Sequence, residues 1–153
     1  MIVNLETTLV HLAKDMRSRG LVIVMANGCF DVLHSGHISH LKVAKKMGDV
    51  LVVTVTRDED VNKGQGRPMF DEVTRMQAVD ALACVDYVCL NNSPGIAIKL
   101  VRPHLYVKGP DYRFKMTEPL QVEKIAVESY GGRLVFTDTP EFHSTDIIAR
   151  GGI

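Results

Sequence analysis

The chain has 153 residues, with 18 Lys or Arg against 18 Asp or Glu, so its formal net charge is zero. A neutral chain has no global basic field, and we therefore expect neither nucleic acid nor an anionic membrane as a partner. Its three cysteines, without C-x-x-C spacing, argue against a disulfide framework and favour a reducing compartment. The first 20 residues carry charges throughout, and no apolar run approaches a membrane span, which predicts a cytoplasmic protein.

The predicted elements alternate between helices and apolar strands. In chain order the pattern predicts a helix at 7–18, a strand at 21–26, a helix at 38–47, a strand at 50–56, a helix at 73–83, a strand at 87–90, a helix at 96–101, a strand at 105–107, a helix at 122–126, a strand at 134–136 and a short helix at 145–150. The strands are apolar at nearly every residue, which is typical of parallel strands covered by helices on both faces. We therefore predict one domain over 1–153, with a helical extension at 1–20 before a Rossmann-like, doubly wound sheet of five parallel strands in the order 3-2-1-4-5.

Polar segments rich in Gly or Pro follow four of these strands. They are GCFDVLHSGH at 28–37, RDEDVNKGQGRP at 57–68, KGPDY at 108–112 and TPEFHST at 139–145. Doubly wound sheets bind ligands at the carboxyl ends of their strands, near the switch in strand order. The four segments are therefore expected to form one binding edge.

The first segment contains the pair His34-x-x-His37, a spacing that zinc sites also use. A metal site is nevertheless not predicted for this pair. One alternative is structural, with His37 capping a helix and His34 filling a turn. The functional alternative is a phosphate cradle, because Gly36 allows close approach to the backbone and a helix N-terminus attracts anions. The glycine patterns of P-loops and dinucleotide-binding turns are absent.

The nucleotidylyltransferase superfamily carries an HxGH signature at the end of its first strand, and HSGH at 34–37 resembles it. The similarity continues through the chain. The adenylyltransferase domain of bacterial heptose-phosphate enzymes resembles, in order, ANGCFDVLHSGHISHL, GRPMFDEVTRMQAV, RPHLYVKGPDY and HSTDII. The resemblance implies transfer of a nucleotidyl group from a nucleoside triphosphate, with ATP favoured and Mg²⁺ bound to it, to a sugar phosphate such as a heptose 1-phosphate. It further implies a homodimer.

The resemblance also implies roles for single residues. Catalytic roles fall on His34, His37, Lys63 and Arg75. Nucleotide binding falls on Gly28, Cys29, Phe30, Asp31, Gly36, Lys108, Gly109, Asp111, Tyr112, Ser144 and Thr145. Other interpretations stay open, namely a helix or turn cap for Asp31, a solvated or surface cation for Lys63 and Arg75, and a helix N-cap for the two hydroxyls.

Other functions remain open. A cytidylyltransferase acting on glycerol 3-phosphate or a related polyol phosphate carries an arginine in the segment that corresponds to 139–145, where Thr139-Pro140 stand here. His143 replaces a small residue of the family pattern, which leaves the sugar pocket open. From other classes, a non-catalytic nucleotide-binding module would keep the fold. In a nicotinamide oxidoreductase Asp58 would bind ribose, but the missing glycine fingerprint argues against it.

Overall fold

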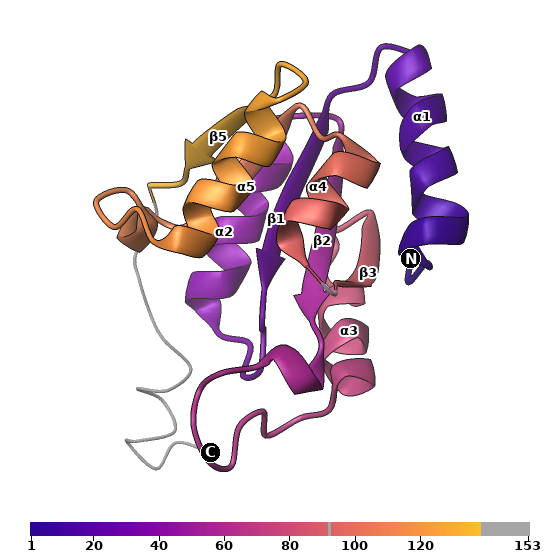
Figure 1. Ribbon diagram of the computed structural model, residues 1–153. Helices are drawn as coiled ribbons and strands as arrows, with labels where there is room; N and C mark the ends of the chain where they lie inside the picture. The colour runs from indigo at the N-terminus through magenta and orange to yellow at the C-terminus, as the bar shows by residue number, and fades with distance from the viewer. Residues whose placement is uncertain (92, 139–153) are drawn as a thin grey trace.

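The computed structural model describes residues 1–91 and 93–138, which build a five-stranded parallel sheet (Figure 1). Its strands are β1 (Ile23–Gly28), β2 (Val50–Thr56), β3 (Tyr87–Asn91), β4 (Leu105–Lys108) and β5 (Arg133–Phe136). Their order is β3-β2-β1-β4-β5, and every pairing between neighbours is parallel. The predicted doubly wound α/β fold and its strand order are confirmed.

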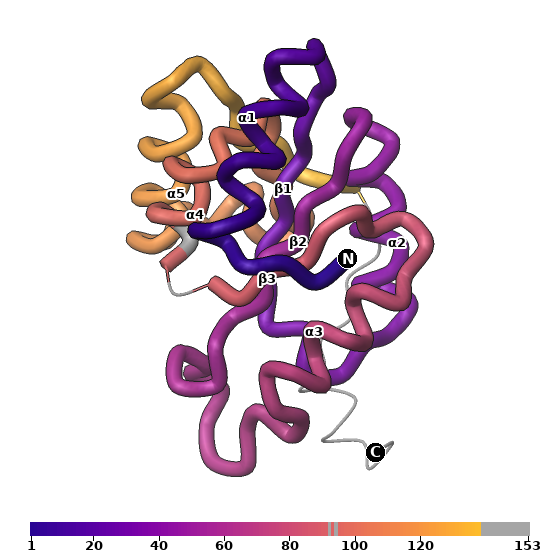
Figure 2. The backbone as a smooth tube through the Cα atoms, turned by 90° about the vertical axis from the view of Figure 1, so that its right-hand side faces the viewer, coloured from indigo at the N-terminus to yellow at the C-terminus, as the bar shows by residue number. Residues whose placement is uncertain are grey.

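Helices cover both faces of the sheet (Figure 2). One face carries α1 (Val10–Ser18), α4 (Pro94–Val101) and α5 (Glu118–Glu128), with the π-helical turn Leu5–Leu9 ahead of α1. The other face carries α2 (Ser35–Lys46) and α3 (Glu72–Asp80). Successive residues of a strand point to opposite faces of the sheet, as Val52 and Val53 of β2 do. Each face packs against a hydrophobic core, so the residues of both faces must be apolar.

The helix ends differ from those predicted by apolar spacing. The first helix after β1 begins at Ser35 instead of 38, because His34 caps it. Similarly, α5 begins at Glu118 instead of 122, because the Thr117 side chain accepts from the backbone N–H of Leu120. In α5 the apolar spacing marked Val122 and Ile125, which are 55% and 68% exposed, whereas the polar cap decides where the helix begins. The predicted helix at 145–150 lies outside the described residues.

Parallel strands bring their carboxyl ends to one edge, and the loops after β1 and β2 lie together there, at the lower end of Figure 1. Two short 3-10 helices, Asp58–Asp60 and Pro110–Tyr112, belong to the loops after β2 and β4. Among the helices within 1–91 and 93–138, none has the length and apolar character needed to cross a membrane.

Candidate functional site

The HSGH turn forms the N-terminus of α2 through both of its histidines. His34 is the N-cap, and its Nδ1 accepts from the backbone N–H of Gly36 at 3.1 Å. His37 reaches back, and its Nδ1 accepts from the backbone N–H of His34 at 3.4 Å. This reciprocal pair is a capping box built from imidazoles. The structural alternative had His37 capping the helix and His34 filling a turn, whereas in the structure His34 is the N-cap and His37 completes the box.

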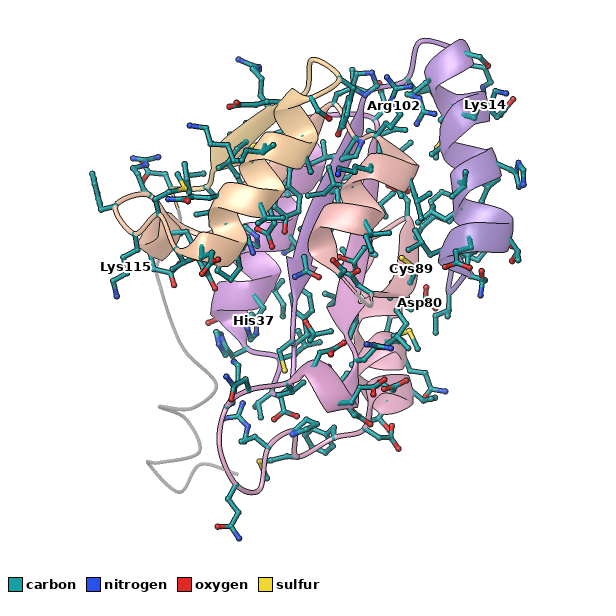
Figure 3. The ribbon with its side chains drawn as sticks, viewed as in Figure 1. Lys14, His37, Asp80, Cys89, Arg102 and Lys115 are labelled. Atoms are coloured by element: carbon teal, nitrogen blue, oxygen red, sulfur yellow. The ribbon has the colours of Figure 1, made fainter. Side chains whose placement is uncertain are left out.

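The capping bonds also set the chemistry of the two rings. Because Nδ1 accepts in each ring, the proton of the neutral imidazole lies on Nε2, which becomes a donor. The rings of His34 and His37 stack with their centroids 3.9 Å apart at an interplanar angle of 26°. Figure 3 shows His37 at the N-terminal end of α2, where the helix dipole favours an anion. Capping and phosphate binding are therefore compatible roles for the same side chains.

Phe30 and Gly28 shape the turn between β1 and α2. Phe30 has a positive φ of 52°, a left-handed conformation that costs energy for a side chain of this size. Its ring folds back so closely that a Cβ on Gly28 would lie 2.9 Å from two ring carbons. The ring edge also meets His37, with centroids 5.5 Å apart. Phe30 is buried, so its contribution to this site is to hold the turn.

Asp31 ties the loop after β1 to the loop after β2. Its buried carboxylate accepts from Arg67 Nε at 2.6 Å and from the backbone N–H groups of Met69 and Phe70 at 2.9 and 3.0 Å. Burial alone would raise the pKa of Asp31, but these three donors together hold it below its ordinary value. These contacts hold the loop after β2 against the loop after β1, and the predicted role of Asp31 in nucleotide binding stays a prediction.

Arg75 is not a surface residue, because only 1% of it is exposed. Its guanidinium donates to the carbonyl oxygens of Cys29 and Thr56, both at 2.8 Å, and of Phe70 at 3.0 Å. Its Nη2 also donates to Asp58 Oδ1 at 2.6 Å. Asp58 is the residue that would bind ribose in a nicotinamide oxidoreductase, and here its carboxylate is paired with Arg75 instead. Arg75 therefore braces the carboxyl ends of β1 and β2, and its predicted role at the phosphates stays a prediction.

A cavity of about 250 Å³ opens at this edge of the sheet. Its lining brings together predicted site residues from three loops: Gly28, Cys29, Lys63, Lys108 and Tyr112. Lys63 is exposed and Lys108 is buried, so the cavity has one cation at its rim and one in its wall. Asn27 also lines the cavity, although sequence reasoning did not single it out.

Lys108 is held by groups from β4 and α5. Its Nζ lies 3.5 Å from Glu123 Oε2, 4.8 Å from the ring centroid of Tyr112 and 5.5 Å from that of Tyr106. Burial raises the pKa of Glu123, and the ammonium of Lys108 opposes that rise. Sequence reasoning missed Glu123, whose only signal is a carboxylate on the buried side of α5.

Gly109 lies next to the Asp111 side chain in the KGPDY turn. A Cβ on Gly109 would lie 2.9 Å from Asp111 Oδ1, the end of a side chain that can rotate away. Burial raises the pKa of Tyr112, with further contributions from the charges of Asp111 and Glu123. The turn therefore presents a protonated phenol beside the ammonium of Lys108.

His40 joins the HSGH helix to the far strands. Its Nδ1 lies 2.7 Å from Thr137 Oγ1, and the Thr137 N–H donates to the Lys108 carbonyl at 2.9 Å. Burial and the charge of Lys108 lower the pKa of His40 from 6.5 to about 4. The part of the chain that the structure describes contains no cluster of three His, Cys, Asp or Glu side chains that could hold a metal ion.

His40 should make the fold sensitive to acid. Its pKa is lower in the folded chain than in the unfolded one, so the unfolded state binds the proton more tightly. The free energy of unfolding therefore falls as the pH drops through 6.5 towards 4, and this single group costs about 2 kcal/mol at pH 5.

The variant His40→Gln keeps a hydrogen bond for Thr137 but does not titrate. Urea unfolding at pH 7 and pH 5 should show a loss about 2 kcal/mol smaller in His40→Gln than in the wild type. Equal losses in the two proteins would show that His40 does not carry this proton linkage.

The predicted hydroxyls Ser144 and Thr145 lie outside the described residues, as does His143 in the same segment. The predicted role of Ser144 and Thr145 in nucleotide binding therefore stays a prediction.

Comparison with known proteins places this geometry in context. The family model described as cytidylyltransferase-like matches residues 25–150. The bifunctional protein HldE of Syntrophotalea carbinolica is 39% identical over 153 residues, covering 97% of this chain and 30% of the relative. The same-named protein of Geobacter metallireducens is 42% identical over 133 residues, covering 84% of this chain and 26% of the relative.

A solved structure shares the fold as well. The lipopolysaccharide core biosynthesis protein from Thermoplasma volcanium GSS1 superposes with a TM-score of 0.67 at 32% identity, over 80% of this chain and 100% of that one. The chain spans about 30% of the length of its curated relative from Syntrophotalea carbinolica.

Proposed function

Since the chain belongs to the cytidylyltransferase-like family, we propose that it transfers an adenylyl group from ATP to a heptose 1-phosphate or a similar sugar phosphate. The resemblance predicted from the motifs is confirmed by the match to HldE proteins, and so is the expected class of enzyme, a nucleotidyltransferase. Support for a sugar phosphate as acceptor comes from the resemblance to heptose-phosphate adenylyltransferases and from the lipopolysaccharide protein that shares the fold.

One observation carries the proposal, namely the stacked pair of imidazoles at the N-terminus of α2. Two Nε2–H donors side by side, next to the positive end of a helix, suit the oxygens of a phosphate chain. The cavity at the same edge of the sheet adds two cations, Lys63 from the loop after β2 and Lys108 from the end of β4. Imidazole and ammonium donors of this kind suit the charge of a triphosphate.

The proposed reaction needs no general base. An oxygen of the acceptor phosphate attacks the α-phosphorus, the bond from this phosphorus to the bridging oxygen breaks, and pyrophosphate leaves with the electron pair. A phosphomonoester has a second pKa of about 6, so at neutral pH the attacking group is mostly a dianion. The side chains at the HSGH turn and the two lysines then act by alignment and by neutralising the charge that develops on the phosphate oxygens.

We further propose that Mg²⁺ enters with the nucleotide. Mg²⁺ is commonly bound by substrate phosphates with few protein ligands, which fits a site whose carboxylate Asp31 is already occupied by three donors. When bound, the ion would offset charge on the triphosphate. The chain's own part is to hold the phosphates, through His34, His37 and Lys63. The expected homodimer also stays a prediction, which sedimentation would measure.

A competition assay tests the function. With equal concentrations of ATP and CTP and a heptose 1-phosphate as acceptor, we expect pyrophosphate release and a product mass that matches an ADP-sugar. Predominant CDP-sugar would overturn the choice of ATP. Product from glycerol 3-phosphate alone would instead favour the polyol cytidylyltransferase. Absence of pyrophosphate with every pair of substrates would favour a non-catalytic nucleotide-binding module.

A further inference from the structure

A relay of hydrogen bonds crosses the carboxyl ends of β1, β2 and β3. The backbone N–H of Ser93 donates to Asn91 Oδ1 at 2.9 Å, and Asn91 Nδ2 donates to Asn27 Oδ1 at 3.1 Å. Thr54 Oγ1 donates to the same oxygen of Asn27 at 2.7 Å. A backbone N–H can only donate, so it sets the direction of each following bond and the orientation of both amides.

The relay leaves Asn27 with one polar group for the cavity. Two donors from the sheet occupy its Oδ1, so its Nδ2 is the atom that can be offered on the other side. Thr54 and Asn91 are 0% and 3% exposed, which places the supporting bonds inside the fold, whereas Asn27 lines the cavity. Buried hydrogen bonds of this kind hold a side chain in a single orientation before any ligand arrives.

The cavity presents donors on several sides. Lys63 and Lys108 can only donate, whereas the hydroxyl of Thr56 donates its one hydrogen to the carbonyl of Gly28 at 3.2 Å and offers the cavity an acceptor. A ligand that accepts from an amide and from two ammonium groups is rich in oxygen and negatively charged. In the proposed reaction both substrates, the sugar phosphate and the triphosphate, have this chemistry.

We infer that Asn27 binds an oxygen atom of a phosphorylated substrate through Nδ2, with Thr54 and Asn91 as positioning residues that fix its amide. The inference rests on the proposed function, and it adds a substrate-binding residue on β1 that the motifs did not mark. The source of the oxygen is either the acceptor or the nucleotide.

The variant Asn27→Asp tests the inference. Aspartate has nearly the same shape, and one of its oxygens can still accept from Thr54 and Asn91, but the other replaces the donor by a negative acceptor. Loss of a hydrogen bond to a charged ligand weakens binding by about tenfold or more. Calorimetry should therefore show a dissociation constant raised to that degree for either ATP with Mg²⁺ or a heptose 1-phosphate, each titrated separately. The ligand affected identifies the source of the oxygen.

Two further variants serve as controls. Asn62→Asp makes the same chemical change in another asparagine of the cavity lining, outside the relay, and should change either dissociation constant less than Asn27→Asp does. Thr54→Val removes a donor to Asn27 without altering the lining, and should weaken binding of the same ligand to a smaller degree.

Unchanged dissociation constants in Asn27→Asp would overturn the inference. An equal effect of Asn62→Asp would overturn it too, because the weaker binding would then come from the added negative charge alone. Turnover by the wild type is measured apart from binding. A wild type that binds these ligands without turnover would refute the proposed function, while the role of Asn27 would still be decided by the calorimetry.

Discussion

The variants His34→Ala and His37→Ala are each expected to lower kcat by about 10²–10³, the range for losing one donor to charge that develops in a transition state. In this site the donors are the Nε2–H groups of two stacked rings, which the capping bonds keep in that tautomer. Removing either ring leaves the other in place, so neither variant should abolish the reaction. Steady-state kinetics at saturating ATP and acceptor measures the loss.

Loss of a helix cap must be separated from loss of a catalytic donor, because an alanine at His34 removes both. The variant His34→Ser restores a side-chain oxygen that can accept from Gly36, without an imidazole. We expect its unfolding free energy to approach that of the wild type while kcat stays low. Recovery of kcat in His34→Ser would instead show that the histidine serves only as a cap.

The variant Arg75→Lys is expected to lower the free energy of unfolding by about 1–3 kcal/mol for each buried carbonyl oxygen that is left without its donor. The guanidinium donates in several directions at once, to three carbonyl oxygens and to Asp58, and a single ammonium cannot reproduce that arrangement. Urea unfolding followed by circular dichroism gives the measurement.

The same substitution at the surface supplies the control for Arg75. Arg19 pairs with Asp15 while both side chains are 61% exposed, so Arg19→Lys should change stability by less than about 0.5 kcal/mol. An Arg75→Lys protein that unfolds like the wild type but has lost turnover would show that Arg75 acts on the phosphates, as the resemblance implied, instead of bracing the strands.

The fold itself was accessible from the sequence because its signals are local and repeated. Runs such as 50–56 are apolar at nearly every position, so a strand formed by them must be covered by helices on both faces of the sheet. Such strands alternate with helices along the chain, and few arrangements of the strands in a sheet allow that order. The position of the HSGH turn was accessible for the same reason, since a Gly-containing polar segment after a buried strand lies at the carboxyl edge. Helix ends were less accessible, because caps such as His34 leave no mark in apolar spacing.

The partners of the polar side chains were decided only by the tertiary structure. Arg75 meets Cys29 across 46 positions and His40 meets Thr137 across 97, and no pattern within either segment specifies the other. The orientation of the Asn27 amide likewise depends on β1, β2 and β3 lying in register. Hydrophobic burial is non-directional, so the types of residue and their spacing along the chain are enough to predict it. A hydrogen bond depends on the distance and angle between two groups, which are set only when the distant segments pack together.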